Sequence, residues 1–268
     1  MPQFKNLMEI FKLLDKSNCR DCNEKTCLAF AAAVFQGRKP LNGCTHLERE
    51  TIDRYERKIQ SKKTMGEEQD EAIDRLKRKI AGIDLEEAAR RLEAKFTAGK
   101  LTIKICGKYF SVDTEGNLST DIHVHSWIAV PFLNYVLYAK GVPPSGEWVP
   151  YRELKGGKAG YRLFEQRCEK ELKRIADTHT DLFEDMIRIF NGRQVENHYE
   201  SDISLVLHPL PKVPILICYW EPEDGFESSL NLFFDSTAED NLNIESIYAL
   251  GTGLVRMFEK LALRHGSQ

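Results

Sequence analysis

Cys19-Arg20-Asp21-Cys22-Asn23-Glu24-Lys25-Thr26-Cys27 is the stretch around which this chain is organised, and Cys44 follows it after sixteen residues. The spacing C-x2-C-x4-C-x16-C gathers four thiols in the first fifth of the sequence. Residues 28–37 form an apolar run closed by Gly37, which is typical of a short helix with a left-handed glycine at its end. The cysteines therefore lie before, at and after one helix and predict a single metal site.

Four thiolates around a helix N-terminus suit an iron–sulfur cluster, because backbone N–H groups at that end ease the negative charge of the cluster. Structural zinc also accepts four thiolates, but its ligands usually come as two C-x2-C pairs, which the x4 and x16 gaps fit poorly. A disulfide framework needs an oxidising compartment, for which the sequence gives no argument. We predict a [4Fe-4S] cluster, with zinc, disulfides and chance spacing as alternatives. Its ligands would be Cys19, Cys22, Cys27 and Cys44.

The cysteine segment, over residues 4–47, resembles the four-cysteine [4Fe-4S] module of corrinoid/iron–sulfur protein large subunits, which also occurs in the B subunit of membrane electron-transport complexes. Where that family frequently has glycine after the second cysteine, this chain has Asn23. The resemblance implies electron transfer to a corrinoid, bound here or by a partner. The implied partner is a redox protein, with a corrinoid-dependent methyltransferase system as its setting. The matching residues are the four cysteines, Leu28-Ala29-Phe30-Ala31 and Gly37.

Length and composition are those of an ordinary soluble protein. With 268 residues, 42% of them hydrophobic, the chain can bury one substantial core and a small appended module. A net charge of −3 favours neither nucleic acid nor an anionic membrane as partner. Residues 4–15 are predicted to form a helix, because their apolar positions follow a helix face rather than a signal sequence, and no apolar run approaches the roughly 20 residues of a membrane span. We expect a cytoplasmic protein.

The composition changes sharply between residues 47 and 95, where more than half of the residues are charged. We interpret this segment as a helical connector stabilised by acid–base pairs four residues apart, with Asp84 capping its last helix. The predicted domains are therefore a cluster module (1–47), a charged connector (48–95) and a larger domain (96–268).

Beyond residue 96 the hydrophobic period alternates between two and 3.6. The order of elements predicts an α+β domain with a largely antiparallel sheet, because the strands are not separated by single crossover helices. The expected strands cover 101–106, 109–112, 203–207, 213–220 and 230–235, and the expected helices cover 127–139, 161–176, 182–190 and 243–263.

Three segments of this region resemble an uncharacterised domain family that follows such cysteine modules in anaerobic bacteria and archaea. They are 146–154, 210–216 and 234–238. The resemblance extends over most of 96–263. It implies domain limits and an anaerobic setting but no catalytic residues.

Two motifs of the larger domain invite a functional interpretation. On an extended backbone His123 and His125 would share one face, as a metal or a planar cofactor requires, although half-exposed strand histidines are the plainer interpretation. Asp121-Ile122-His123 is also similar to the D-x-H-x-x-G loop whose histidine ligates cobalt in corrinoid-binding domains, with Ser126 in place of the glycine. Gly251-Thr252-Gly253 interrupts the last predicted helix, and close packing or an approaching ligand would equally explain it.

These observations predict a cytoplasmic electron-transfer protein rather than a stand-alone catalyst. Four protein thiolates leave no iron open to a substrate, so the cluster would act as a relay. Two alternatives remain open: a non-redox scaffold with a structural metal module, and a small-molecule reductase acting in the α+β domain.

Overall fold

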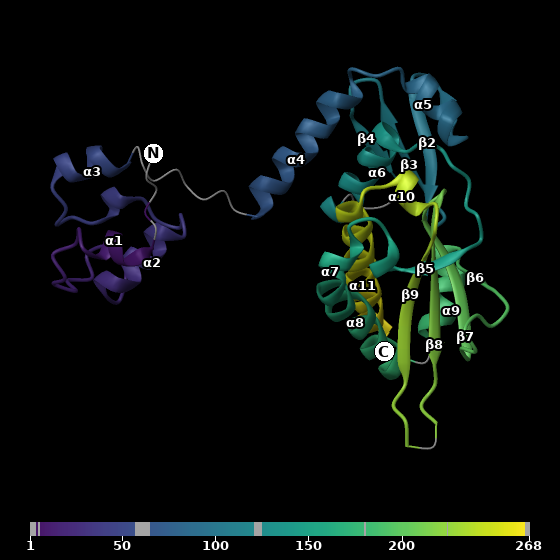
Figure 1. Cartoon of the computed structure of the whole chain (residues 1–268). Coiled ribbons are helices and arrows are strands. Elements are labelled where there is room, and N and C mark those ends of the chain that lie inside the picture. Colours follow the sequence, from purple (N-terminus) through teal and green to yellow (C-terminus); the bar gives the residue numbers. More distant parts are fainter. Residues whose placement is uncertain are drawn as a thin grey trace. The chain divides into compact units, whose positions relative to one another are not determined.

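The computed structural model of the chain describes residue 4 and residues 6–56, 65–120, 125–179, 181–223 and 225–265. Its contacts divide the chain into one unit of Met1–Gln69 and a second of Asp70–Gln268 (Figure 1). Helices and antiparallel sheets together make up the second unit, so the predicted α+β class is confirmed. Among the described residues, no helix has both the length and the apolar character needed to cross a bilayer.

The first unit is a small helical bundle. Its elements are α1 (Leu7–Phe11), α2 (Cys27–Phe35), the 3-10 turn η1 (Leu41–Gly43) and α3 (Arg49–Glu56). Its core joins Ile10 of α1 to Phe30 and Val34 of α2. The predicted helix at 4–15 is shorter than expected, because the Asn6 side chain accepts the Met8 and Glu9 N–H groups and so begins the helix at Leu7.

The second unit includes the latter half of the segment that we expected to be a connector. Helix α4 (Met65–Ile80) crosses the division, and α5 (Leu85–Leu92) begins at Asp84, whose carboxylate accepts the Glu86 and Glu87 N–H groups at 3.0 Å. The apolar residues of α5 recur at helical spacing and are at most 2% exposed: Leu85, Ala88, Ala89 and Leu92. This stripe packs into the main core.

A four-stranded antiparallel meander follows α5. Its strands, in spatial order, are β1 (Lys95–Thr97), β2 (Lys100–Ile105), β3 (Lys108–Asp113) and β4 (Leu118–Thr120). Cys106 and Gly107 join β2 to β3, and both have positive φ, 47° and 79°. Two left-handed residues in a two-residue loop match the twist of the paired strands, which accounts for the predicted hairpin.

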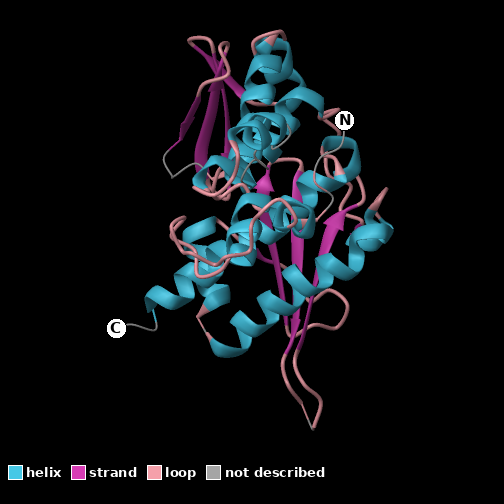
Figure 2. Ribbon diagram, turned by 90° about the vertical axis from the view of Figure 1, so that its left-hand side faces the viewer, coloured by secondary structure: helices cyan, strands magenta, loops and turns pink. Residues whose placement is uncertain are grey.

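The larger sheet has five antiparallel strands in the order β5-β9-β8-β7-β6. They are β5 (Trp148–Pro150), β6 (Arg193–Gln194), β7 (Ile203–Leu210), β8 (Val213–Trp220) and β9 (Ser229–Asp235). Figure 2 shows helices in front of the long strands of this sheet. The remaining helical elements are α6 (Ser126–Tyr138), η2 (Tyr151–Glu153), α7 (Gly157–Phe164), a π-helical turn η3 (Glu165–Glu169), α8 (Lys170–Thr178), α9 (Leu182–Phe190), α10 (Ala238–Asn241) and α11 (Ile244–His265).

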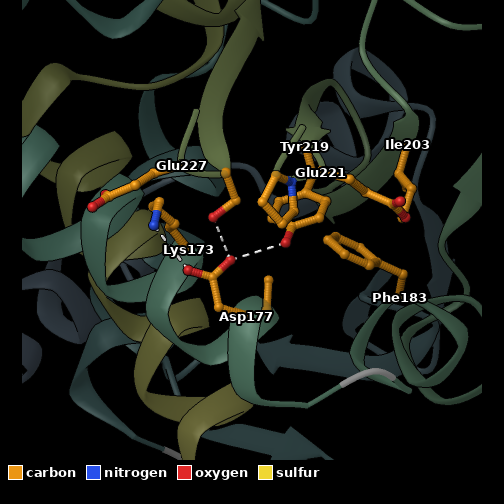
Figure 3. A pocket seen from close by; sticks show the side chains of 10 residues that line it. Lys173, Asp177, Phe183, Ile203, Tyr219, Glu221 and Glu227 are labelled. Carbon is orange, nitrogen blue, oxygen red and sulfur yellow. Dashed lines mark hydrogen bonds and ion pairs between the residues drawn. The ribbon is translucent and has the colours of Figure 1, made fainter. Parts of the chain in front are cut away.

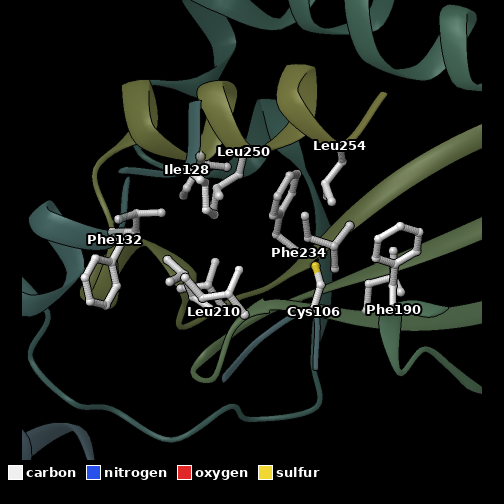
Figure 4. Close-up of a cluster of buried hydrophobic side chains, with 14 of the residues drawn as sticks. Cys106, Ile128, Phe132, Phe190, Leu210, Phe234, Leu250 and Leu254 are labelled. Carbon is white, nitrogen blue, oxygen red and sulfur yellow. The ribbon is translucent and has the colours of Figure 1, made fainter. Parts of the chain in front are cut away.

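The surroundings of strand β8 explain why its sequence is apolar without alternation. Ile215 and Ile217 pack in the main core, whereas Leu216 and Cys218 pack on the opposite face in a smaller cluster. Because alternate residues of a strand point to opposite faces, a strand covered on both sides is apolar throughout. In the main core, Leu250 and Leu254 of α11 lie over Phe234 of β9 (Figure 4).

Close packing explains the glycines of α11, which runs without interruption through Gly251-Thr252-Gly253. A Cβ atom on Gly253 would overlap the indole ring of Trp127 in α6. One on Gly251 would lie 2.8 Å from the ring of Phe164 in α7. Both glycines therefore allow other elements to approach α11, and the expected interruption of the helix is wrong.

A buried carboxylate fixes the loop that leads into β5. Asp235 is fully buried, and its oxygens accept the N–H groups of Ser145, Gly146 and Thr237 at 2.7–3.0 Å. Burial acts to raise the pKa of Asp235, but the hydrogen bonds from these neighbours outweigh it and hold the pKa below its usual value. Gly146 and Asp235 belong to two of the segments that carry the resemblance to the uncharacterised domain family, 146–154 and 234–238. These two segments therefore meet at a hydrogen-bonded contact.

Candidate metal centre

The four cysteines belong to the first unit and line the region around the N-terminus of α2. Cys27 is the first residue of α2, and Cys44 directly follows η1. Each of these two residues is 7% exposed, whereas Cys22 is half-buried and Cys19 is exposed. All of these thiols are free. The site is therefore buried on the α2 side and open on the side of Cys19.

The loop before α2 has an unusual backbone conformation. Lys16, Asn18 and Arg20 have positive φ values of 63°, 53° and 72°, and they alternate with residues of negative φ. Asn23, at the position where the resembled family has glycine, also has positive φ, 59°. Left-handed non-glycine residues are uncommon. Four such residues in one short loop indicate a backbone that is held in place by its tertiary contacts.

Asn18 and Cys27 bond each other reciprocally. The Asn18 N–H donates to Cys27 Sγ at 3.3 Å, and Asn18 Oδ1 accepts the Cys27 N–H at 2.8 Å. The second bond satisfies one of the N–H groups that a helix leaves without an internal partner at its start. Thr26 Oγ1 accepts the Ala29 N–H at 3.1 Å and satisfies another. Asn18 thereby holds both the backbone N–H and the sulfur of Cys27.

The environment of Cys44 shows that Cys19 and Cys22 lie near it. Burial raises the pKa of the Cys44 thiol, and the nearby Cys22, Asp15 and Cys19 act in the same direction. The backbone N–H of His46 opposes them by hydrogen bonding to the sulfur. Neighbouring negative charges disfavour the ionisation of a thiol, and a bound cation reverses this effect. A coordinated metal therefore deprotonates such thiols. The donor set therefore fits a thiolate-bound metal or cluster.

Sequence reasoning missed His46. Its Nδ1 lies 3.4 Å from Asp15 Oδ2, and its Nε2 lies 3.2 Å from Asp21 Oδ2. Ligand atoms of Cys19, Asp21 and His46 all lie within 4.8 Å of one another. The only signal in the sequence was the position of His46 two residues after Cys44, because the approach of the two acids depends on the fold.

Lys39 supplies a positive charge to the same loop. Its ammonium donates to the Cys22 carbonyl at 2.6 Å and lies 3.1 Å from Glu24 Oε1. The contact with the Cys22 carbonyl joins the segment after α2 to the cysteine loop.

The structure does not test the proposed pairing of the two candidate histidines of the larger unit. His123 lies outside the described residues. His125 is exposed and has an extended backbone immediately before α6. The shared face predicted for the two imidazoles therefore remains a prediction.

The three other cysteines are structural. Cys106 is 6% exposed, and Cys168 and Cys218 are fully buried. Burial raises the pKa of Cys106 to about 12, so that its thiol stays protonated. These residues therefore behave as small buried hydrophobes.

Together, the left-handed loop, the N–H···S contact and the four thiols define a cysteine-cage module attached to an α+β domain. Residues 14–46 match the family described as "Putative Fe-S cluster", which supports an iron–sulfur protein. Residues 84–257 match the family described as "Domain of unknown function (DUF3786)". Since this match covers more than half of the chain, the chain belongs to the DUF3786 family.

One curated relative matches part of the chain. The acetyl-CoA decarbonylase/synthase complex subunit gamma of Methanocaldococcus jannaschii is 32% identical over 59 residues. The match covers 22% of this chain and 12% of that subunit, so the chain spans only a small part of the length of its relative. No solved structure matches. Both resemblances seen in the sequence are confirmed.

Proposed function

We propose that the chain is an electron-transfer protein in which Cys19, Cys22, Cys27 and Cys44 hold one [4Fe-4S] cluster. A bound cluster would supply one-electron redox chemistry. The observation that carries the proposal is the N–H···S contact at the start of α2, where the Asn18 N–H donates to Cys27 Sγ at 3.3 Å in a segment that holds four free thiols. Structural zinc is the weaker alternative, because its ligands usually come as two C-x2-C pairs, which the x4 and x16 gaps of this chain fit poorly.

The exposure of the thiols suggests where electrons enter or leave. Cys19 is exposed and Cys22 half-exposed, so a partner can approach that side, whereas Cys27 and Cys44 are covered. Four protein thiolates leave no position for a substrate, which favours a relay over catalysis at the metal. The redox partner would be another protein, in keeping with a relative that is named as a subunit of a complex.

The electron acceptor that we propose is a corrinoid, held by this chain or by its partner. This step rests on the resemblance to corrinoid/iron–sulfur proteins. His123 and His125 are the imidazoles that we propose for a corrinoid pocket. We further propose a cytoplasmic location, since a reducing compartment keeps single buried cysteines such as Cys106 free.

Anaerobic reconstitution tests the cluster. We expect iron and acid-labile sulfide each to approach about four per chain, the stoichiometry of a [4Fe-4S] centre. Serine variants of each of the four cysteines should lose or convert the cluster, whereas Cys106→Ser, matched in chemistry but placed in the second unit, should keep it. Stoichiometric zinc without sulfide in anaerobically purified protein would refute the cluster and favour a structural metal module.

Titration of cobalamin into the anaerobic protein tests the acceptor separately. We expect a change in the cobalamin spectrum and measurable binding heat, both reduced by His123→Ala or His125→Ala. Absence of binding would remove a corrinoid from this chain while leaving the cluster proposal intact, and electron transfer would then be sought with a partner protein.

A second candidate function, a metal-stabilised scaffold without redox activity, is favoured by one observation. Cys19, Asp21 and His46 offer mixed sulfur, oxygen and nitrogen donors within 4.8 Å of one another, as zinc accepts. The two functions differ in the variant His46→Ala. It should release the metal if His46 is a ligand, and it should leave the iron and sulfide content unchanged if the four thiolates suffice.

A further inference from the structure

The second unit contains a cavity of about 640 Å³ that neither the family nor the cysteine module explains. It opens beside the C-terminal end of α8, and its lining comes from α8, α9, β7, β8 and the segment that joins β8 to β9 (Figure 3). Cavities of a few hundred to a thousand Å³ are typical of small-molecule sites. The chemistry of its lining indicates which class of molecule it accepts.

Asp177 forms the polar centre of the cavity and is held by three donors. Its Oδ1 accepts the hydroxyl groups of Tyr219 at 2.9 Å and Ser228 at 2.6 Å, and its Oδ2 accepts the Lys173 ammonium at 2.8 Å. Figure 3 shows these bonds converging on the carboxylate. Partial burial acts to raise the pKa of Asp177, but the bonds from Lys173, Ser228 and Tyr219 outweigh it and lower the pKa. Asp177 is therefore ionised, and it neutralises Lys173.

An aromatic pair forms the apolar wall. The rings of Phe183 and Tyr219 have centroids 5.3 Å apart and an interplanar angle of 43°. Both residues are mostly buried, and Ile203 and Ala176 line the cavity with them. Such a wall offers apolar contact to the body of a ligand and ring faces or edges to a charged group.

The remaining charges on the lining are negative. Glu221 and Glu227 are exposed and belong to the segment that joins β8 to β9. The lining thus holds three carboxylates, on Asp177, Glu221 and Glu227, against one ammonium, on Lys173. Since Lys173 is already paired, a phosphate or carboxylate ligand would meet excess negative charge, whereas a cation would be attracted.

We propose that this cavity binds an organic cation, an amine carried on an aromatic or other apolar body. Its apolar part contacts the wall of Phe183 and Tyr219, and its ammonium group is attracted by Glu221 and Glu227. The inference is independent of the cysteine module, because all of the residues that carry it belong to the second unit.

Calorimetric titration of the full chain with three probes of similar shape tests the charge preference. The probes are phenethylamine, the neutral 2-phenylethanol and the anionic phenylacetate. We expect the amine to bind at least several-fold more tightly than the alcohol, the anion to bind most weakly, and salt to reduce the binding of the amine. The proposal is overturned if the anion or the alcohol binds as tightly as the amine, or if none of the probes binds at millimolar concentration.

Variants locate the binding. The double substitution Glu221→Gln and Glu227→Gln should weaken the amine about fivefold, since each exposed carboxylate contributes a small electrostatic attraction. Glu223→Gln, in the same segment but outside the lining, is the matched control and should leave affinity unchanged. Phe183→Leu keeps apolar volume but removes the ring and should weaken the amine more than the alcohol. Equal affinity of the double variant and the wild type would place the amine elsewhere and refute the site.

Discussion

Asn18 is the residue through which the first unit can be tested most directly, because it has two separable roles. Its Oδ1 accepts the Cys27 N–H at 2.8 Å, and its backbone has a φ of 53°. Asn18→Ala removes the acceptor and places a residue with little tolerance for left-handed backbone at this position. Loss of the hydrogen bond should cost about 1 kcal/mol. The left-handed conformation should cost alanine about another 1 kcal/mol.

Two further substitutions separate these contributions. Asn18→Gly also removes the acceptor but accepts positive φ freely, so its cost should be about 1 kcal/mol. Asn18→Asp keeps an acceptor oxygen and tolerance of the left-handed region, and a negative charge near the start of α2 is favourable. We therefore expect the aspartate variant to resemble the wild type in the metal-free protein.

Hydrogen exchange of the α2 amides in the reduced, metal-free chain measures these differences, because it reports the free energy of local opening. The expected order of protection is wild type and Asn18→Asp first, then Asn18→Gly, then Asn18→Ala. Wild-type protection in Asn18→Ala would show that the side-chain bond does not stabilise α2. Equal loss of protection in the glycine and alanine variants would show that the left-handed backbone carries no cost.

Three further predictions concern the second unit. Gly253→Ala should destabilise it by about 1–3 kcal/mol, since the added methyl group overlaps the Trp127 ring, and thermal unfolding measures the loss. Asp235→Asn should cost about 2–3 kcal/mol at neutral pH, because an amide cannot accept all of the hydrogen bonds that the carboxylate accepts, and denaturant unfolding followed by circular dichroism measures it. A fragment of residues 70–268 should fold, whereas a fragment of 96–268 should be markedly less stable, since it lacks the buried stripe of α5.

Each of these predictions has a control or a contrary outcome. Thr252→Ala, between the two packed glycines of α11, should change stability little, and a loss equal to that of Gly253→Ala would refute the packing argument. The pKa of Asp235 is lowered by folding, so its contribution is complete above the ordinary carboxyl pKa of about 4 and is lost as the pH falls through the folded value. The difference between wild type and Asp235→Asn should therefore shrink in acid. Equal stability of the two fragments would show that α5 is dispensable.

Much of the fold could be predicted because local signals agreed with tertiary packing. Gly37 follows α2 with a φ of 73°, as its place after the apolar run indicated, and Asn191, with a φ of 55°, directly follows α9 where the expected helix 182–190 ends. Strands β7, β8 and β9 were predicted near their observed positions because each joins apolar residues to clear turn signals, whereas the short strands β5 and β6 were not predicted. In these segments the local sequence alone indicated the secondary structure.

Three features of the fold and the site were not predicted, each for its own physical reason. Half of residues 85–92 are charged, which hid a core helix from a reading of composition, yet the four apolar residues all lie on one face. The π-helical turn at Glu165–Glu169 divides a segment that reads as one regular helix, because no residue type marks such a turn. The approach of His46 to Asp15 and Asp21 joins residues up to 31 positions apart and follows only from the packing of the first unit.

The left-handed asparagine after the second cysteine has a consequence for tracing this module in other genomes. Asn23 adopts a φ of 59°, which a glycine would adopt without cost, so either residue can meet the backbone requirement of this position. A search pattern that demands glycine there would discard this chain. A pattern that admits glycine or asparagine, while excluding β-branched residues, would retain it and follow the geometry that the loop requires.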